Sequence, residues 1–124
     1  MIEPAVFPPQ LPEGSIVRLD GRGEVFVRRH IHPDRNAPTV LLLHGWTASV
    51  DAQFIAVYER LAETCSFVGL DHRGHGRGLR TFDRYELEDV ADDAADEPVD
   101  GLDVNQVRRQ LVLQHAQLML RLGV

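Results

Sequence analysis

Residues 39–46, TVLLLHGW, place a histidine and a glycine directly after an apolar run, and a helical pattern follows them. At such a strand-to-helix turn, the first backbone N–H groups of the helix have no partner within the helix. These groups can bind an anion or an oxyanion that develops during a reaction. Gly45 would let the backbone approach a ligand closely, because glycine has no side chain. His44 and Gly45 therefore mark a candidate oxyanion site, although a His-Gly pair alone is equally typical of a plain tight turn.

A second glycine-rich turn strengthens this interpretation. Residues 71–76, DHRGHG, follow the very next apolar run, so the two turns belong to one strand, helix and strand unit. The turn also carries His72 and His75. Two histidines in this position are more typical of an exposed turn than of a pair of metal ligands.

The segment from His30 to Asp34, HIHPD, offers a different chemistry. Its H-x-H-x-D pattern resembles part of the site of binuclear metallo-hydrolases, where close imidazoles and a carboxylate could hold zinc. In that motif a histidine comes next, whereas this chain has Arg35, a fixed positive charge. A zinc-dependent hydrolase is therefore the weaker alternative, and we expect neither a metal nor another cofactor.

The composition limits the remaining classes. The chain has 124 residues, which suits one domain, and a formal net charge of −6, so nucleic acid is not an expected partner. No apolar run approaches the roughly 20 residues that a membrane helix needs. The first 15 residues lack the basic start and apolar core of a signal peptide. The single cysteine, Cys65, cannot form an internal disulfide. Together these observations lead us to expect a cytoplasmic protein without a membrane partner.

The elements that position the two turns follow from the apolar pattern. Residues 15–30 contain two β-rich runs around a glycine-containing turn, which predicts a β-hairpin. Residues 39–43 and 66–70 are short apolar runs, typical of parallel strands covered on both faces. Between them, apolar residues spaced by three and four predict one helix, capped by Ser49 or Asp51. The stripe consists of Phe54, Val57, Tyr58, Leu61, Ala62 and Cys65. Together these elements predict a βαβ unit with parallel strands.

The last third of the chain changes character twice. Residues 83–103 carry ten acidic residues and one arginine, which predicts a solvated helix face followed by a loop. Residues 104–124 contain no acidic residue. Their apolar spacing is compatible with a helix that begins at a capping box formed by Asp103 and Gln106 and stops at Gly123.

These segments resemble a known family. TVLLLHGW, the amphipathic helix and FVGLDHRGHGRG together look like the front half of an α/β-hydrolase, the fold of many esterases, lipases, epoxide hydrolases and C–C bond hydrolases. The resemblance implies an α/β fold in partial form, made up of the hairpin, the βαβ unit with parallel strands and the acidic helix. Residues 104–124 depart from the family pattern and are compatible with a further, C-terminal helix. We divide the chain into an irregular segment, residues 1–14, the half-domain, residues 15–97, and a divergent tail, residues 98–124.

The resemblance also implies roles for residues of the two turns. His44 and Gly45 would form the oxyanion-hole turn, and the N–H of Trp46 would be one oxyanion donor. Trp46 would also line the acyl pocket. The family's D-x-R-G-x-G turn has a mostly structural role, in which the glycines permit the turn and the polar side chains tie loops together. Its residues here are Asp71, Arg73, Gly74 and Gly76.

The chain departs from the family pattern where the nucleophile is expected. Family members carry it in a G-x-S-x-G elbow after the next strand, followed by the acid and the histidine. The only serines are Ser15, Ser49 and Ser66, none of which lies between glycines at that spacing. Cys65 is better explained as a core residue of the predicted helix. We therefore predict a truncated member, inactive alone, whose parent enzyme hydrolyses an ester or related small acyl substrate through a serine nucleophile.

Two alternatives retain the same fold. The chain could be a non-catalytic module that self-associates through an exposed sheet edge, or a fragment that another polypeptide completes. The tail is either the accidental translation of a frame-shifted gene or a helix that caps the exposed sheet. All of these alternatives contain the two turns, but they assign different functions to them.

Overall fold

A computed structural model describes residues 11–45, 47–81 and 87–96, and residues 105, 106, 109, 110, 113, 117, 120, 121 and 123. The elements within these ranges are β1 (Glu13–Leu19), β2 (Gly23–His30), β3 (Thr39–Leu43), α1 (Val50–Phe54), α2 (Tyr58–Ala62), β4 (Ser66–Leu70) and α3 (Leu87–Ala95). The predicted hairpin, both apolar strands and the acidic helix are confirmed. The predicted residues Trp46 and Asp103 lie outside the described part of the chain.

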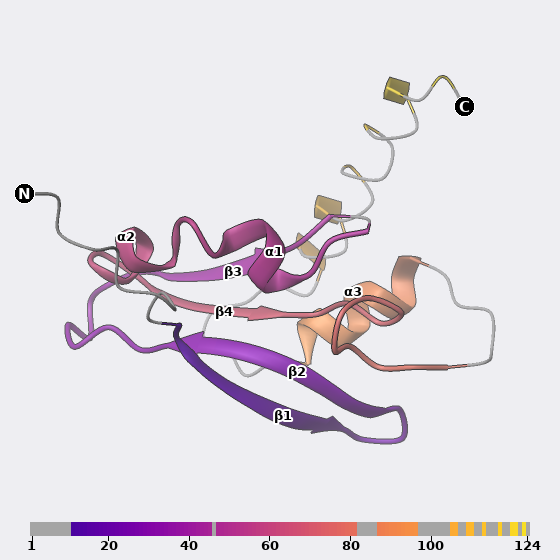
Figure 1. Cartoon of the computed structure of the whole chain (residues 1–124), viewed down its shortest axis with the longest axis horizontal. Helices are drawn as coiled ribbons and strands as arrows, with labels where there is room; N and C mark the ends of the chain where they lie inside the picture. The colour runs from indigo at the N-terminus through magenta and orange to yellow at the C-terminus, as the bar shows by residue number, and fades with distance from the viewer. Residues whose placement is uncertain are drawn as a thin grey trace, which may run out of the picture.

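The strands form one mixed sheet in the order β1-β2-β4-β3 (Figure 1). β1 pairs antiparallel with β2, and β2 pairs antiparallel with β4. β3 and β4 are parallel, in a register that runs from Thr39 beside Ser66 to Leu43 beside Leu70. The parallel pair of the predicted βαβ unit is therefore confirmed. Its two carboxyl ends lie next to each other at one end of the sheet.

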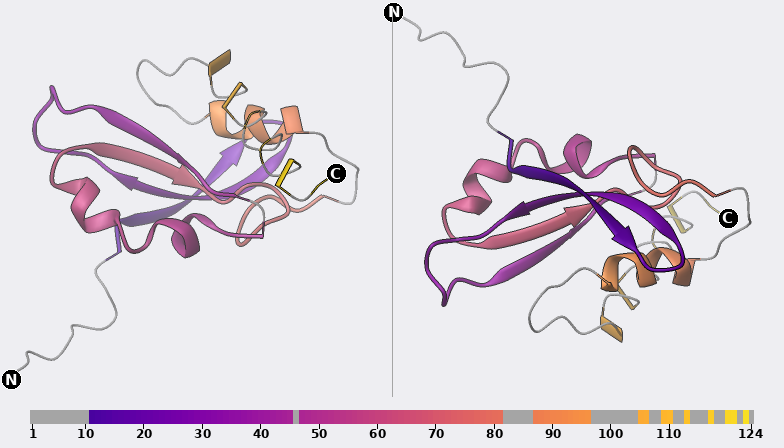
Figure 2. Two further views of the ribbon diagram at one scale, coloured as in Figure 1. Left: turned by 90° about the horizontal axis from the view of Figure 1, so that it is seen from above. Right: turned by 90° about the horizontal axis from the view of Figure 1, so that it is seen from below.

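Helices cover the sheet on both faces. Figure 2 shows α1 and α2 on one side of the sheet and α3 on the other. The face under α3 packs around Val27, Val68 and Leu70, with Ala91 and Ala94 contributed by the helix. The opposite face packs around a second set of residues, which are Phe26, Leu42, Val50, Tyr58 and Phe67. Alternate residues of β2, β3 and β4 thus enter different cores, because successive side chains of a strand point to opposite faces.

α1 packs closely on the sheet because β4 has a glycine beneath it. A Cβ atom at Gly69 would lie 2.6 Å from Cγ2 of Val50 and 3.1 Å from Cβ of Leu42. The first of these contacts is shorter than side chains tolerate, so only glycine lets Val50 reach the sheet at this point. Val50 is fully buried as a result, and it fixes the start of α1.

The prediction of a single helix between the two parallel strands is wrong. The segment is broken into α1 and α2 by a turn at residues 55–57, in which the N–H of Val57 donates to the carbonyl of Phe54 at 2.9 Å. Val57 is 46% exposed, so it does not belong to the apolar stripe. Ile55 and Val57 are β-branched and lower the helix propensity of the segment. Tyr58 alone of the predicted stripe is fully buried, at 2% exposure.

The described residues of the C-terminal segment are helical between positions 105 and 121. Gly123 has a φ of +72°, and its N–H donates to the carbonyl of Leu120 at 3.3 Å. This left-handed conformation is typical of a glycine that ends a helix, as predicted. The domain boundaries stay predictions.

Candidate functional site

The two predicted turns lie side by side. His44 follows the last residue of β3 and Asp71 follows the last residue of β4, and these last residues, Leu43 and Leu70, are partners in the parallel ladder. The carboxyl ends of neighbouring parallel strands are where open α/β sheets place their ligands. The two turns follow consecutive parallel strands in the sequence, and these strands are also neighbours in the sheet.

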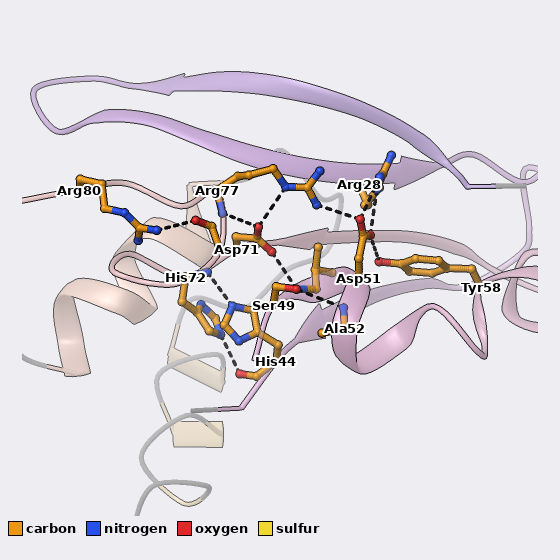
Figure 3. A network of polar contacts seen from close by, with 12 residues as sticks. Arg28, His44, Ser49, Asp51, Ala52, Tyr58, Asp71, His72, Arg77 and Arg80 are labelled. Atoms are coloured by element: carbon orange, nitrogen blue, oxygen red, sulfur yellow. Dashed lines mark hydrogen bonds and ion pairs between the residues drawn. The ribbon is translucent and has the colours of Figure 1, made fainter. Parts of the chain in front are cut away.

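Hydrogen bonds join the turns directly through His44 and His72 (Figure 3). Nε2 of His44 accepts the backbone N–H of His72 at 2.8 Å, so His44 carries its proton on Nδ1, which donates to the carbonyl of Gly45 at 2.8 Å. The Nε2 of His72 in turn donates to the backbone carbonyl of His44 at 3.1 Å. His44 is therefore neutral with its proton on Nδ1, and His72 carries a proton on Nε2.

Burial keeps these histidines uncharged. His44 is 2% exposed and His72 is 4% exposed, and their ring centroids are 4.1 Å apart. Burial lowers the pKa of His44 below its usual value. For His72, burial and the neighbouring His44 lower the pKa to about 3. The prediction that the histidines lie on an exposed turn is therefore wrong for His72, which packs within the protein.

Gly45 presents the exposed donor of the first turn. Its carbonyl accepts the His44 ring N–H and the N–H of Ala48, the latter at 3.3 Å. Its N–H donates to Oε1 of Gln53, on α1, at 2.6 Å. Thr47 has a φ of +61°, a left-handed conformation that is uncommon for a residue with a branched side chain. The N–H of Gly45 is thus oriented toward a carbonyl oxygen that a side chain supplies.

The second turn is built around the buried carboxylate of Asp71. One oxygen of Asp71 accepts the N–H of Val50, at the start of α1, and the other accepts the N–H of Arg77, both at 2.8 Å. Gly74 and Gly76 have φ values of +77° and +44°. A Cβ atom at Gly76 would also lie 2.5 Å from a carboxylate oxygen of Asp71. Asp71 therefore ties the second turn to the helix that follows the first.

Arg73 connects the same turn to α3. Its Nε and Nη2 donate to the two carboxylate oxygens of Asp93 at 2.7 and 2.8 Å. Arg22, in the hairpin turn, donates to the same carboxylate at 2.8 Å and also pairs with Asp96. Asp93 is 1% exposed. The prediction of a solvated acidic face is therefore wrong at Asp93, which is buried because two arginines from other elements neutralise it.

A third cluster holds α1 and α2 to β2. Asp51 accepts both Nε and Nη2 of Arg28 at 2.9 Å, and the Arg77 guanidinium and the Tyr58 hydroxyl at 2.8 Å (Figure 3). Burial raises the pKa of Asp51, but these hydrogen bonds outweigh burial and hold the pKa at about 2. Ser49 is the helix cap, since its Oγ accepts the N–H of Ala52 at 3.1 Å. Asp51 is left to bind the arginines.

The three serines lie in different parts of the fold. Ser49 caps α1, and Oγ of Ser66 accepts the backbone N–H of His32 at 2.8 Å. Ser15 lies exposed on β1. Cys65 is half-buried after α2, with its sulfur 3.4 Å from Oγ1 of Thr64.

The H-x-H-x-D segment lies in the loop that leaves β2. Nδ1 of His32 accepts the N–H of Asp34 at 3.0 Å, and Nε2 donates to the carbonyl of Glu63 at 2.9 Å. His30 packs its ring against Phe67. Both ring nitrogens of His32 thus bind the protein itself. Across the described ranges, no three histidine, cysteine, aspartate or glutamate side chains gather in a way that could hold a metal ion.

Comparisons with known proteins agree with this architecture. A family model described as the alpha/beta hydrolase fold matches residues 38–107, more than half of the chain. A bifunctional esterase/perhydrolase of Acinetobacter calcoaceticus is 36% identical over 61 residues, which are 49% of this chain and 22% of that enzyme. The crystal structure of E-2-(acetamidomethylene)succinate hydrolase superposes with a TM-score of 0.51 at 32% identity, over 67% of this chain and 30% of the hydrolase.

The chain belongs to the α/β-hydrolase fold family. It spans less than a third of the length of either relative. None of the described helices is both long and apolar enough to cross a membrane.

Sequence reasoning missed Gln53, Asp93 and the buried pair of His44 and His72. Gln53 is an exposed polar residue on a helix, so its type carries no signal of the contact with Gly45. The arginines that bind Asp93 are far away in the sequence. A histidine directly after each of two consecutive strand ends was a usable signal for the histidine pair, once the strands were known to be neighbours.

Proposed function

We propose that the turn formed by His44 and Gly45 binds the carbonyl oxygen of an ester or a related small acyl substrate. The parent activity is hydrolysis through a serine nucleophile and an oxyanion intermediate. The observation that supports this most is the exposed N–H of Gly45, which donates to a carbonyl oxygen at 2.6 Å. The esterase and hydrolase named above are consistent with an acyl substrate.

By this proposal the chain contributes oxyanion binding and is inactive alone. His44 and His72 are buried, neutral and bonded to each other, so neither is placed to act as the base for a serine. Two of the three serines bind backbone N–H groups. The roles of Gly45 and Trp46 as oxyanion donors are part of the proposal.

The test uses the whole 124-residue chain. Purified protein should hydrolyse p-nitrophenyl acetate no faster than buffer, yet its single tryptophan, Trp46, should change its fluorescence saturably when acetate is added. A burst of p-nitrophenol that a Trp46→Pro change abolishes would contradict inactivity. A fluorescence signal that acetate does not change would contradict oxyanion binding at this turn.

A second candidate function is self-association through the outer edge of β3. The N–H of Ser66 donates to the carbonyl of Pro38 at 2.9 Å, and backbone groups alternate in direction along a strand. The peptide groups of Thr39, Leu41 and Leu43 therefore face away from β4, and β3 has only β4 as a partner strand among the described residues. An edge of this kind can pair with a second copy of the chain.

Sedimentation of the wild-type chain and of Thr39→Pro separates this candidate. Thr39 is exposed, and its N–H faces the open edge, so proline removes one outward donor and leaves the β4 ladder intact. We expect oligomers for the wild type and a shift toward monomer for Thr39→Pro. A wild-type chain that melts cooperatively as a monomer would contradict self-association.

A further inference from the structure

The donor that the proposed function assigns to an acyl oxygen is already occupied. Oε1 of Gln53 accepts the N–H of Gly45 at 2.6 Å, from a position eight residues later in the chain. A side-chain amide presents a neutral, planar carbonyl with two lone pairs, as an ester does. Gln53 therefore takes the place that a substrate oxygen would need.

The rest of the turn is held without Gln53. The carbonyl of Gly45 accepts from the ring of His44 at 2.8 Å and from the N–H of Ala48 at 3.3 Å. The start of α1 is bound by the Ser49 cap and by the buried Asp71, which accepts the N–H of Val50 at 2.8 Å. These bonds fix the backbone on both sides of Gly45, so the bond to Gln53 can open without changing the shape of the turn.

Gln53 is also able to leave. Gly45 and Gln53 are both exposed, so water can replace either partner when the bond opens. A glutamine side chain is long and rotates freely when it is not bound, which favours its release. A hydrogen bond in such a position contributes modestly to stability, because water competes for both groups.

We infer that Gln53 controls access of an acyl oxygen to the N–H of Gly45. The donor is blocked when Oε1 of Gln53 is bound to it, and it is accessible when the Gln53 side chain turns away. This inference rests on the proposed function, because it assumes that Gly45 is a ligand donor. A ligand must displace Gln53, so its apparent affinity is reduced by the fraction of molecules that are closed. From the usual net strength of a hydrogen bond, removing the internal acceptor should raise the affinity about two- to tenfold.

The experiment titrates acetate into the full, isotope-labelled chain and follows the Gly45 amide by NMR. Gln53→Met is compared with the wild type, since methionine is similar in length and lacks the carbonyl. Ala56→Met is the matched control, because it places the same side chain at an exposed position three residues further along. We expect acetate to bind Gln53→Met about two- to tenfold more tightly than the wild type, and Ala56→Met to match the wild type.

A second readout needs no variant. The scalar coupling across the hydrogen bond from the Gly45 nitrogen to the side-chain carbonyl carbon of Gln53 should be present without ligand and lost at saturating acetate. Equal acetate affinity in Gln53→Met and the wild type, or a coupling that persists at saturation, would overturn the role of Gln53 and leave the proposed function standing. An amide of Gly45 that acetate shifts in no variant would overturn both.

Discussion

His44 and His72 bind each other in both directions: the ring of His44 accepts the backbone N–H of His72 at 2.8 Å, and the ring of His72 donates to the backbone carbonyl of His44 at 3.1 Å. A charged His44 could not accept this N–H, because both ring nitrogens of an imidazolium are donors. The join between the two turns therefore requires a neutral His44. It follows that the stability of the fold, rather than the charge of the folded site, depends on pH near the usual pKa of histidine.

The chain should lose stability as the pH falls below about 6.5. The unfolded chain binds a proton at each of these histidines near pH 6.5, whereas the folded pKa of His72 is about 3 and that of His44 is lowered too. The unfolded state then binds more protons, so the free energy of unfolding falls by about 2 kcal/mol between pH 7 and pH 5 for His72 alone. Urea unfolding of the wild type and of His72→Gln between pH 7 and 5 measures this. The free energy of unfolding of His72→Gln should fall by about 2 kcal/mol less than that of the wild type over this range, and equal falls would contradict the assignment.

Asp51 should contribute stability that does not vary across the same pH range. Its folded pKa of about 2 lies below its usual value of 3.8, so the contribution is complete above about pH 4 and is lost only as the pH falls toward 2. Asp51→Asn should lower the free energy of unfolding by about 2 kcal/mol, equally at pH 7 and pH 5. Glu59→Gln, which changes an exposed acid on α2, serves as the control. A cost for Asp51→Asn that grows as the pH falls from 7 to 5 would contradict this account.

Asp93 should matter far more than the other acids of α3. It is 1% exposed and binds Arg22 and Arg73, so Asp93→Asn leaves two arginines facing a neutral group. We expect a loss of about 3 kcal/mol, the lower end for breaking a buried ion pair, since Arg22 is partly exposed. Glu88→Gln on the exposed side of the helix should cost less than about 0.5 kcal/mol. Thermal unfolding of both variants would decide, and similar melting temperatures would refute the difference.

Gly76 should tolerate alanine worse than another glycine with positive φ. At Gly76 the cost combines the left-handed conformation with a Cβ atom 2.5 Å from Asp71, whereas a Cβ atom at Gly21, with a φ of +72°, meets nothing within 4 Å. Gly21→Ala should therefore cost about 1 kcal/mol, from the backbone alone. Gly76→Ala should cost about 1 to 3 kcal/mol more, because a buried carboxylate must move. Equal losses in chemical denaturation would show that Asp71 adapts freely.

The local sequence pattern predicted the strands of the fold better than it predicted the helix between them. β3 and β4 have the predicted bounds, since each is a short apolar run between turn residues. The helix between them was predicted as one piece because the apolar spacing continues across Val57. The spacing did not reveal that the backbone turns there, since periodicity reports which residues are apolar and not whether the helical hydrogen bonds persist.

The sequence predicted the two motifs of the candidate site but not the contacts between them. His44, Gly45 and Asp71 were selected by residue type and by their positions after apolar runs. Their mutual contacts depend on β3 and β4 being neighbours in the sheet. The sequence held no local sign of the Gln53 contact or of the two arginines on Asp93, because these partners are joined only by the packing of separate elements.

By itself the sequence determined the family, the strands, the two turns and the scarcity of serine, because each is encoded by residues adjacent in the chain. The tertiary structure alone decided which charges are buried, which histidines must stay neutral and which side chain occupies the N–H of Gly45. These properties depend on desolvation and on distances between residues far apart in the sequence. Such distances exist only once the sheet has brought the carboxyl ends of β3 and β4 together.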